Sequence, residues 1–407
     1  VHSRGRITFA PVESVETPDK YTAVLKLAHP SLVILSALNA VESQLLPRHL
    51  YEGTDIYKNP HNLAPVGTGP FKFKEWRKGQ YIALERNPDY WDSGKPRLDR
   101  VIFRIVPDAA SRAAALETGD VQYAPFDAVP QADVQRLRDN PELVVSTKGY
   151  DWQSQYVFLE FNLRNPILAK REVRQAFAHA IDTRALVDTI WYGLGKPATG
   201  PVPSTLRQFY TQDGVPTYRF DRAQAERLLD AAGYPRKTDG VRFSIFQDYQ
   251  PFNEAFKFQA EYLRQSLKAV GVDVKVRNQD LAGFVKRVYT DYDFDINTGQ
   301  WSPYLDPQIG VIRQYWSKGI SAGVPWTNAS GYSNPELDKL IEAAQVEGQA
   351  GKRVKLFHEF QRVVQKDLPV LPLFEIHHFT VYSKKLHGVS RAPDGGFASL
   401  KDAWLQP

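Results

Sequence analysis

The segment VRFSIFQDYQPFNEAFKFQAEYLRQSLKAVGVDVKVRNQDLAGFVKRVYTDYDFDINTGQW, residues 241–301, changes its hydrophobic period several times. Apolar residues two positions apart predict three strands, which begin near Val241, Val272 and Phe294. Between these strands, apolar residues three and four positions apart predict two helices, and Gly271 ends the first. Strands joined by helices in this way form a parallel sheet with right-handed crossovers most economically, so we expect an α/β fold.

Ligands of such sheets bind beyond the carboxyl ends of the strands. Two loops have that position, 247–252 and 298–307, and both combine aromatic residues with turn-forming ones. Loop aromatics of this kind indicate a binding surface, although they can also simply cover a hydrophobic core. The candidate ligand-binding residues in and after these loops are Tyr249, Gln250, Phe252, Trp301, Ser302, Tyr304, Asp306, Arg313 and Asn328.

The glycine-rich stretch PVGTGPFKF, residues 65–73, raises the question of a phosphate-binding loop. Such a loop ends in Gly-Lys-Ser/Thr, whereas Pro70 and Phe71 follow the second glycine here. Apolar and polar residues alternate on both sides of the turn at 77–79, which instead predicts a hairpin. We therefore expect a scaffold element with a polar face.

Similar patterns extend along the rest of the chain. Alternating apolar residues predict strands at 21–27, 101–105 and 156–161. Aspartates at three helix starts are predicted N-caps: Asp108, Asp182 and Asp221. Helices and strands thus alternate throughout, as expected for a mixed α/β chain.

Composition limits the function classes. The chain has 407 residues, of which 43% are hydrophobic and 24% charged, and this length predicts at least two lobes. Its 51 basic and 46 acidic residues are interspersed, which argues against nucleic-acid binding. The most apolar run, 32–41, is interrupted by Ser36 and Asn39 and is far shorter than a membrane span, so we expect a soluble chain. The absence of cysteine excludes disulfides and thiol chemistry.

Motifs for catalysis and metal binding are weak. Asp291, Asp293 and Asp295 are spaced as if they shared a strand face, but they match neither a calcium loop nor a convincing catalytic pair. His377 and His378 are predicted on a strand, where neighbours face opposite sides and do not share a metal. We expect no enzyme activity, no metal site and no cofactor.

Five segments occur in a characteristic order along the chain. They are PVGTGPFKF (65–73), ERNPDYW (85–91), DRVIFRIVPDAASRAAALETGDVQ (99–122), KREVRQAFAHAID (170–182) and GYSNPELDKLI (331–341). Together they resemble the extracellular solute-binding proteins of family 5, the dipeptide, oligopeptide and nickel receptors of ABC importers. The resemblance extends over nearly the whole chain.

The resemblance implies a two-lobed venus-flytrap fold of the type II periplasmic binding protein kind, cluster C, with the N-terminal part of lobe I absent. The implied domains are 1–65, a remnant of the peripheral subdomain of lobe I; 66–150, lobe I; 151–375, lobe II; and 376–407, a return segment to lobe I. The implied function is capture of a small-molecule solute between the lobes and its delivery to the transmembrane permease subunits. Such a receptor is monomeric and either periplasmic or extracellular and membrane-anchored.

The chain departs from this family at both charged anchors for dipeptides. The resemblance implies an Arg for the peptide carboxylate where Gln250 stands, and an Asp for the amine where Tyr304 stands. Asp306 matches a second acidic position and is interpreted mainly as a turn former. Because a buried charge is costly unless it is paired, we expect a sugar-like, aromatic or modified peptide-like solute and not a plain dipeptide.

Trp301 coincides with the tryptophan that lines the cleft in this family. Its replacement by Ala is therefore expected to reduce affinity more than stability. The leading alternative function is the ligand-sensing domain of a transcriptional regulator that uses the same fold. The residues preceding Val1 distinguish the two, since a signal peptide indicates import and a helix-turn-helix indicates regulation.

Overall fold

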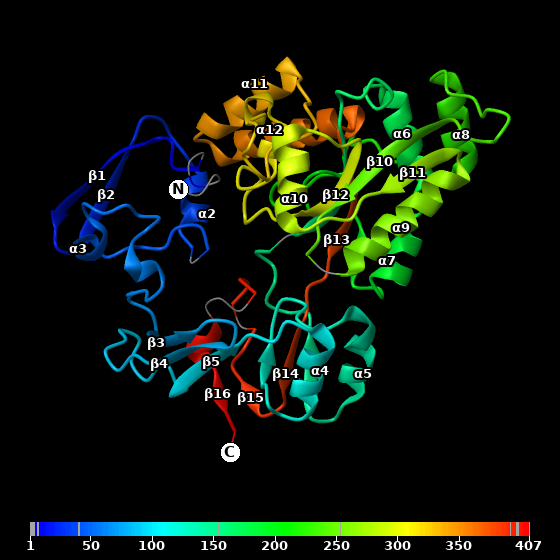
Figure 1. Ribbon diagram of the computed structural model, residues 1–407. Coiled ribbons are helices and arrows are strands. Elements are labelled where there is room, and N and C mark those ends of the chain that lie inside the picture. The colour runs from blue at the N-terminus through cyan, green and yellow to red at the C-terminus, as the bar shows by residue number, and fades with distance from the viewer. Residues whose placement is uncertain are drawn as a thin grey trace. The chain divides into compact units, whose positions relative to one another are not determined.

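The computed structural model describes Gly5 and residues 8–39, 41–153, 155–252, 254–390, 392–395 and 399–406. The chain forms two compact units (Figure 1). The larger comprises Val1–Ala37 and Ser154–His377, and the smaller comprises Leu38–Gln153 and His378–Pro407. The domain boundaries that the resemblance implies stay a prediction. The two compact units differ from these implied domains, because residues 1–37 belong to the larger unit.

The larger unit is built on a six-stranded sheet with strand order β11-β10-β12-β8-β13-β9 (Figure 1). Its strands are β8 (Tyr156–Phe161), β9 (Gly195–Pro197), β10 (Phe243–Tyr249), β11 (Val272–Val276), β12 (Ile296–Trp301) and β13 (Val370–Ile376). β10 pairs in parallel with both β11 and β12, which confirms the three parallel strands predicted from the sequence. The other pairings, of β12 with β8 and of β13 with β8 and β9, are antiparallel, so the complete sheet is mixed.

Helices cover both faces of this sheet (Figure 1). The helices on one face are α6 (Arg171–Ala180), α7 (Thr183–Ile190), α8 (Arg222–Ala231) and α9 (Glu254–Ala269), and those on the other are α11 (Pro335–Val346) and α12 (Ala350–Asp367). The side chains of β8 alternate between the two hydrophobic cores, with Leu159 on the first face and Phe158 on the second. A strand buried on both faces is apolar at nearly every position, which explains the run YVFLEF and makes its Glu160 conspicuous.

The segment between β11 and β12 contains α10 (Leu281–Val285), which continues as the π-helical η3 (Lys286–Asp291). The strand β12 begins only at Ile296. The expectation that three aspartates at 291, 293 and 295 share a strand face was therefore wrong, because the helical end and a loop separate them. Asp295 instead accepts hydrogen bonds from the Phe246 backbone N–H, 2.7 Å, and from Asn165 Nδ2, 2.7 Å.

The described part of the smaller unit contains three short sheets, two longer helices and several short helical turns. Its elements are β3 (Phe71–Arg77), β4 (Tyr81–Arg86), β5 (Arg100–Arg104), α4 (Ala109–Glu117), β6 (Tyr123–Ala124), α5 (Val134–Asp139), β7 (Leu143–Ser146), β14 (Thr380–Ser383), β15 (Leu386–His387) and β16 (Trp404–Leu405). β3 and β4 form the predicted hairpin, and β5 extends it. A strand, and not a helix, follows Gly69, which agrees with a scaffold and not a phosphate loop.

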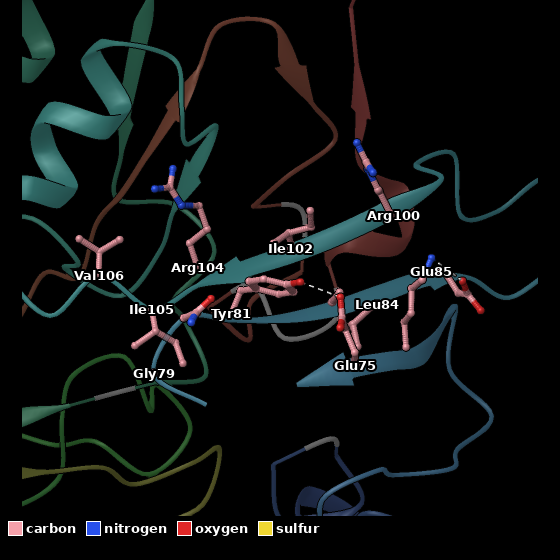
Figure 2. Close-up of a pocket in the computed structure, with 13 residues that line it drawn as sticks. Glu75, Gly79, Tyr81, Leu84, Glu85, Arg100, Ile102, Arg104, Ile105 and Val106 are labelled. Atoms are coloured by element: carbon pink, nitrogen blue, oxygen red, sulfur yellow. Dashed lines mark hydrogen bonds and ion pairs between the residues drawn. The ribbon is translucent and has the colours of Figure 1, made fainter. Parts of the chain in front are cut away.

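Figure 2 shows a hollow on one face of the β3–β4–β5 sheet. The Tyr81 hydroxyl donates to Glu75 Oε1 there, 2.7 Å, and lowers the pKa of that carboxyl. Ile102, in the centre of β5, is 47% exposed. Acidic and basic side chains alternate around the hollow, which fits the polar face expected of this hairpin.

The shorter elements are β1 (Val12–Asp19), β2 (Thr22–Leu27), α2 (Val33–Ala37), α3 (Arg48–Tyr51), η1 (Pro60–Asn62), η2 (Gln131–Asp133), η4 (Ile312–Gln314), η5 (Ser317–Gly319) and η6 (Ser399–Asp402). The strand predicted at 21–27 exists as β2, but Tyr21 lies in the preceding turn and Leu25 is exposed. The predicted N-caps Asp108, Asp182 and Asp221 are confirmed, since each side chain accepts a backbone hydrogen bond.

Two negative findings concern the described residues alone. No helix among them is both long and apolar enough to cross a membrane. No group of three or more His, Asp or Glu side chains in these ranges is arranged to hold a metal ion. His377 and His378 lie between β13 and β14 and not within a strand as predicted, and His378 Nδ1 is 2.5 Å from Asp127 Oδ2.

Candidate ligand-binding site

All candidate residues belong to the larger unit, on or after β10 and β12. The carboxyl ends of these two strands lie side by side, because Tyr249 pairs with Thr298 in a parallel ladder. The loops that follow them are therefore adjacent, as predicted from the βαβ pattern. The structure thus brings Gln250 next to the strand that carries Trp301.

Gln250 is held tightly over β12. Its backbone N–H donates to Thr298 O, 2.9 Å, and its Oε1 accepts from the Gln300 N–H, 2.9 Å. The amide lies directly against Gly299, where a Cβ would overlap it. The side chain is completely buried, and its Nε2 has no hydrogen-bond partner. A residue without a side chain at 299 is therefore required for Gln250 to adopt this position.

Tyr249 lies on the opposite face from Gln250, because neighbouring residues of a strand alternate. Its ring packs in the core beneath the α6–α9 helices, and its hydroxyl donates to Asn278 Oδ1, 2.8 Å. Phe252 is 44% exposed, and its ring centroid is 5.8 Å from that of Trp326. The structure therefore does not bring Tyr249 together with Gln250 on one surface.

Trp301 ends β12 on the same face as Gly299 and is only 2% exposed. Its ring meets Phe158 edge to face, with centroids 5.8 Å apart, in the core under α11 and α12. The Arg313 guanidinium lies 5.0 Å from the Trp301 ring centroid. The indole Nε1 has no hydrogen-bond partner. Trp301 is thus packed in the core, and its buried indole N–H has no hydrogen-bond partner.

The loop after Trp301 contains Ser302 and Tyr304, both partly buried, and Asp306, which is buried. Asp306 Oδ1 accepts from the Gln308 N–H, 2.9 Å, as expected of a turn former. Arg353 of α12 holds both carboxylate oxygens, at 2.5 and 2.7 Å. The structure therefore favours the structural interpretation of Asp306. The sequence offered no signal for this pair, which is separated by 47 residues.

Asn328 is completely buried, and its amide is used within its own loop. Its Nδ2 donates to Trp316 O, 3.1 Å, and to Tyr332 O, 2.8 Å, while its Oδ1 accepts from Ser330 Oγ, 2.8 Å, and from the Gly331 N–H, 3.1 Å. These bonds shape the loop, so the arrangement favours a positioning role for Asn328 over direct ligand contact.

Two further buried carboxylates, Asp248 and Glu160, lie near the candidate loops. Burial raises the pKa of Asp248, and the Arg277 guanidinium, 2.5 Å from Asp248 Oδ2, opposes this shift. Arg277 is therefore committed to Asp248. Glu160 on β8 was missed from the sequence, although a charged residue in a strand otherwise buried on both faces was a usable signal.

Glu160 joins the sheet to the loop that carries Asn328. Its Oε2 accepts from Asn297 Nδ2, 2.7 Å, and its Oε1 accepts from the Ser330 N–H, 3.0 Å. Burial raises the pKa of Glu160 to about 7, although these hydrogen bonds oppose the shift. Asn297 Oδ1 has no partner and could accept from a protonated Glu160 after rotation of the amide.

The Glu160→Gln substitution is expected to remove a pH dependence of stability. The folded protein retains a proton on Glu160 between pH 4.5 and about 7 that the unfolded chain releases, so the free energy of unfolding falls as pH rises through this window. The free energy of unfolding of the wild type should fall by roughly 2–4 kcal/mol across this pH window. Urea unfolding of wild type and variant from pH 4.5 to 8 measures the difference. The exposed Glu172→Gln serves as control, and parallel curves for wild type and Glu160→Gln would contradict the prediction.

The chemistry of these residues is that of binding. The buried carboxylates near β10 and β12 are paired with Arg or amide side chains. Some buried N–H groups in the same region have no hydrogen-bond partner. The fold, a mixed sheet covered by helices on both faces, is of the kind expected for the periplasmic binding class.

Comparison with known proteins identifies the family. Residues 2–323 match the model of the bacterial extracellular solute-binding proteins, family 5 Middle, and the chain belongs to this family. The resemblance inferred from the sequence motifs is thereby confirmed. The protein is a substrate-binding protein of an ABC importer and not an enzyme, and members of its family are periplasmic or extracellular.

Several relatives cover nearly the whole chain. It is 29% identical to the oligopeptide-binding protein AppA of Bacillus subtilis (strain 168), over 98% of this chain and 73% of AppA. It is 28% identical to the glutathione-binding protein GsiB of Salmonella typhimurium, over 100% of this chain and 76% of GsiB.

Solved structures show the same fold. AppA of Bacillus subtilis in complex with a nonapeptide superposes with a TM-score of 0.81 at 26% identity, covering 98% of this chain and 79% of AppA. AgaA from A. tumefaciens R10 in complex with agropinic acid superposes with a TM-score of 0.77 at 25% identity, covering 100% of this chain and 81% of AgaA.

Proposed function

We propose that this protein captures a sugar-like, aromatic or modified peptide-like solute, and not a free dipeptide, and delivers it to the permease subunits of an ABC importer. The observation that carries the choice of solute is the engagement of the buried carboxylates. Asp306 is bound by Arg353, Asp248 by Arg277 and Glu160 by Asn297 and Ser330, so none of these three offers a pairing partner for a ligand ammonium group.

The replacement of a cationic anchor by Gln250 supports the same conclusion for the carboxylate end of a peptide. A neutral amide hydrogen-bonds to oxygen atoms but does not neutralise a charge. The named relatives bind solutes that differ widely, since one is an oligopeptide-binding and one a glutathione-binding protein, and AgaA was solved with agropinic acid. A member of this family whose solute is not a dipeptide is therefore in keeping with these relatives.

Free dipeptides are expected to bind weakly or not at all. Their ammonium and carboxylate groups would lose water without gaining a charged partner, at a cost of several kcal/mol. Since each 1.4 kcal/mol is about tenfold in affinity, micromolar binding would become undetectable by calorimetry. The same dipeptides acetylated and amidated at their ends are the control without terminal charges. Tight binding of several unrelated free dipeptides would refute the proposed solute class.

The remaining features of the proposal are a monomeric receptor that does not bind nucleic acid and is periplasmic or tethered to the outside of the membrane. The interspersed charges argue against nucleic-acid binding, because such binding requires a clustered basic surface. Light scattering and DNA binding at low salt test these points. No observation on the described residues favours the alternative of a regulator's sensing domain over a receptor for import.

A further inference from the structure

Three buried polar residues lie in a row across the six-stranded sheet. Asp248 of β10 pairs with Asn297 of β12, and Asn297 pairs in turn with Glu160 of β8. Residues in register on neighbouring strands point to the same face of a sheet, and here it is the face on which Phe158 packs beneath α11 and α12. None of the three side chains has exposed surface. Two carboxyl groups and one amide thus lie within an otherwise apolar core.

The two carboxyl groups of the row are held in different ways. Asp248 is paired with a cation, because Arg277 Nη2 lies 2.5 Å from its Oδ2. Glu160 instead accepts from two neutral donors, the Ser330 backbone N–H at 3.0 Å and Asn297 Nδ2 at 2.7 Å. A buried carboxylate without a cation is costly, so the surroundings of Glu160 favour its protonated form.

The hydrogen bonds of Glu160 leave one atom for a proton. A backbone N–H can only donate, so Oε1 accepts from Ser330 in both protonation states. The proton therefore belongs on Oε2, which faces the Asn297 amide. Asn297 Oδ1 has no hydrogen-bond partner, and rotation of the amide brings this acceptor to the proton. The site accommodates the protonated carboxyl without any movement of the backbone.

Loop 326–331, which contacts Glu160 through Ser330, has a strained beginning. Its ends, Trp326 and Gly331, have left-handed backbone conformations with φ of 62° and 74°. Glycine adopts this conformation freely, whereas a residue with a large side chain does so only where surrounding contacts hold it. The loop therefore depends on its attachments to the rest of the unit.

These attachments come from β8 and the residues that follow it. Besides the bond from Ser330 to Glu160, the Leu163 N–H donates to Ser330 O, 2.8 Å, and Arg164 Nη1 donates to Ala329 O, 2.8 Å. Among these three bonds, the one to Glu160 contains a group that titrates near neutral pH. Its protonation state is therefore the variable part of the attachment.

We propose that Glu160 is a proton-operated latch on loop 326–331, which stays closed while Glu160 holds a proton and opens to admit water when the proton leaves. Opening relieves the cost of a buried carboxylate, because water then solvates the charge. Burial raises the pKa of Glu160 from 4.5 to about 7 in the closed loop, so the closed form binds more protons and rising pH favours the open form.

The latch connects pH to the candidate ligand-binding loops. The Trp326 ring packs on Phe252 of the loop after β10, with centroids 5.8 Å apart, so opening of 326–331 removes a neighbour of that loop. This regulation goes beyond the proposed function and does not depend on the class of solute.

The other titratable groups that face Glu160 have to be distinguished from it. Burial raises the pKa of three neighbouring tyrosines, which stay neutral at these pH values: Tyr156, Tyr289 and Tyr315. Burial also dominates the pKa of Glu160 itself, and the Arg164 guanidinium, which stays charged, opposes the rise. Asp248 is the competing candidate, because burial raises its pKa as well.

Hydrogen–deuterium exchange of the full chain between pH 5.5 and 7.5 tests the latch. After correction for intrinsic exchange, the opening constant of amides 327–331 should rise by about tenfold over this range. Glu160→Gln keeps an acceptor for Ser330 and gains a donor for Asn297 Oδ1, so it imitates the protonated carboxyl and should vary by less than about twofold. Asp248→Asn is the matched control on the same row and should retain the rise seen in the wild type.

Infrared spectra of wild-type protein labelled with carboxyl-¹³C glutamate give a second readout that requires no variant to fold. They should show a protonated glutamate at pH 6 that is lost by pH 8. A wild type with a constant opening equilibrium, or without protonated glutamate at pH 6, would overturn the latch. An unchanged rise in Glu160→Gln would do the same, and loss of the rise in Asp248→Asn alone would assign the proton to Asp248 and refute the role of Glu160.

Discussion

Trp301→Ala is expected to lower the free energy of unfolding by about 3–5 kcal/mol and to weaken solute binding at least tenfold. The stability loss follows from the position of the ring, which is 2% exposed and packs on Phe158 in the core beneath α11 and α12. The affinity loss follows from removal of the indole N–H at the end of β12. The sequence alone placed the effect mainly on affinity, and the burial of the ring adds the expected loss of stability.

Trp301→Phe separates the two contributions. Phenylalanine keeps an aromatic ring against Phe158 but has no N–H, so most of the stability should be retained while the loss of affinity persists. Thermal unfolding without ligand and calorimetry with acetyl-Ala-Ala-Ala-amide on the same preparations give both quantities. A Phe variant that binds as well as wild type would assign Trp301 to the core alone.

Arg353→Met is expected to destabilise the protein by about 3–5 kcal/mol, because it leaves the Asp306 carboxylate buried without its cation. Both side chains of this pair are only 3% exposed, and the contact is bidentate. Arg353 Nη2 also donates to Gln308 Oε1, 3.0 Å, so the loop following Trp301 should loosen as well. Urea unfolding measures the stability, and protease cleavage within 302–312 reports on the loop.

Two variants make this prediction specific. The double substitution Asp306→Asn with Arg353→Met removes both charges and should recover part of the loss, since the penalty comes from the unpaired charge. Arg362→Met, on the same helix, breaks partly exposed pairs with Glu359 and Asp213 and should cost less than about 1 kcal/mol. Equal losses of unfolding free energy in Arg353→Met and Arg362→Met would show that the buried Asp306 carboxylate does not need its cation. Such a result would contradict the structural interpretation of this pair.

The sequence alone determined those features that depend on a few neighbouring residues. The three parallel strands and their connecting helices follow from changes of hydrophobic period, and the N-caps follow from Asp at the helix starts. The hairpin of β3 and β4 follows from alternation across a short turn. The family could be inferred because each of its motifs is a contiguous segment of this chain, and the family model matches residues 2–323.

Only the tertiary structure decided which distant residues meet. β8 and β12 are separated by more than a hundred residues, and their antiparallel pairing is what places Tyr156 beside Trp301 and Glu160 beside Asn297. A periodic pattern shows that a strand has a buried face but not what covers it, so the burial of Trp301 was not apparent. The unpartnered indole N–H of Trp301 has the same origin. Whether a polar atom is satisfied depends on every group around it, and those groups come together only when the chain is folded.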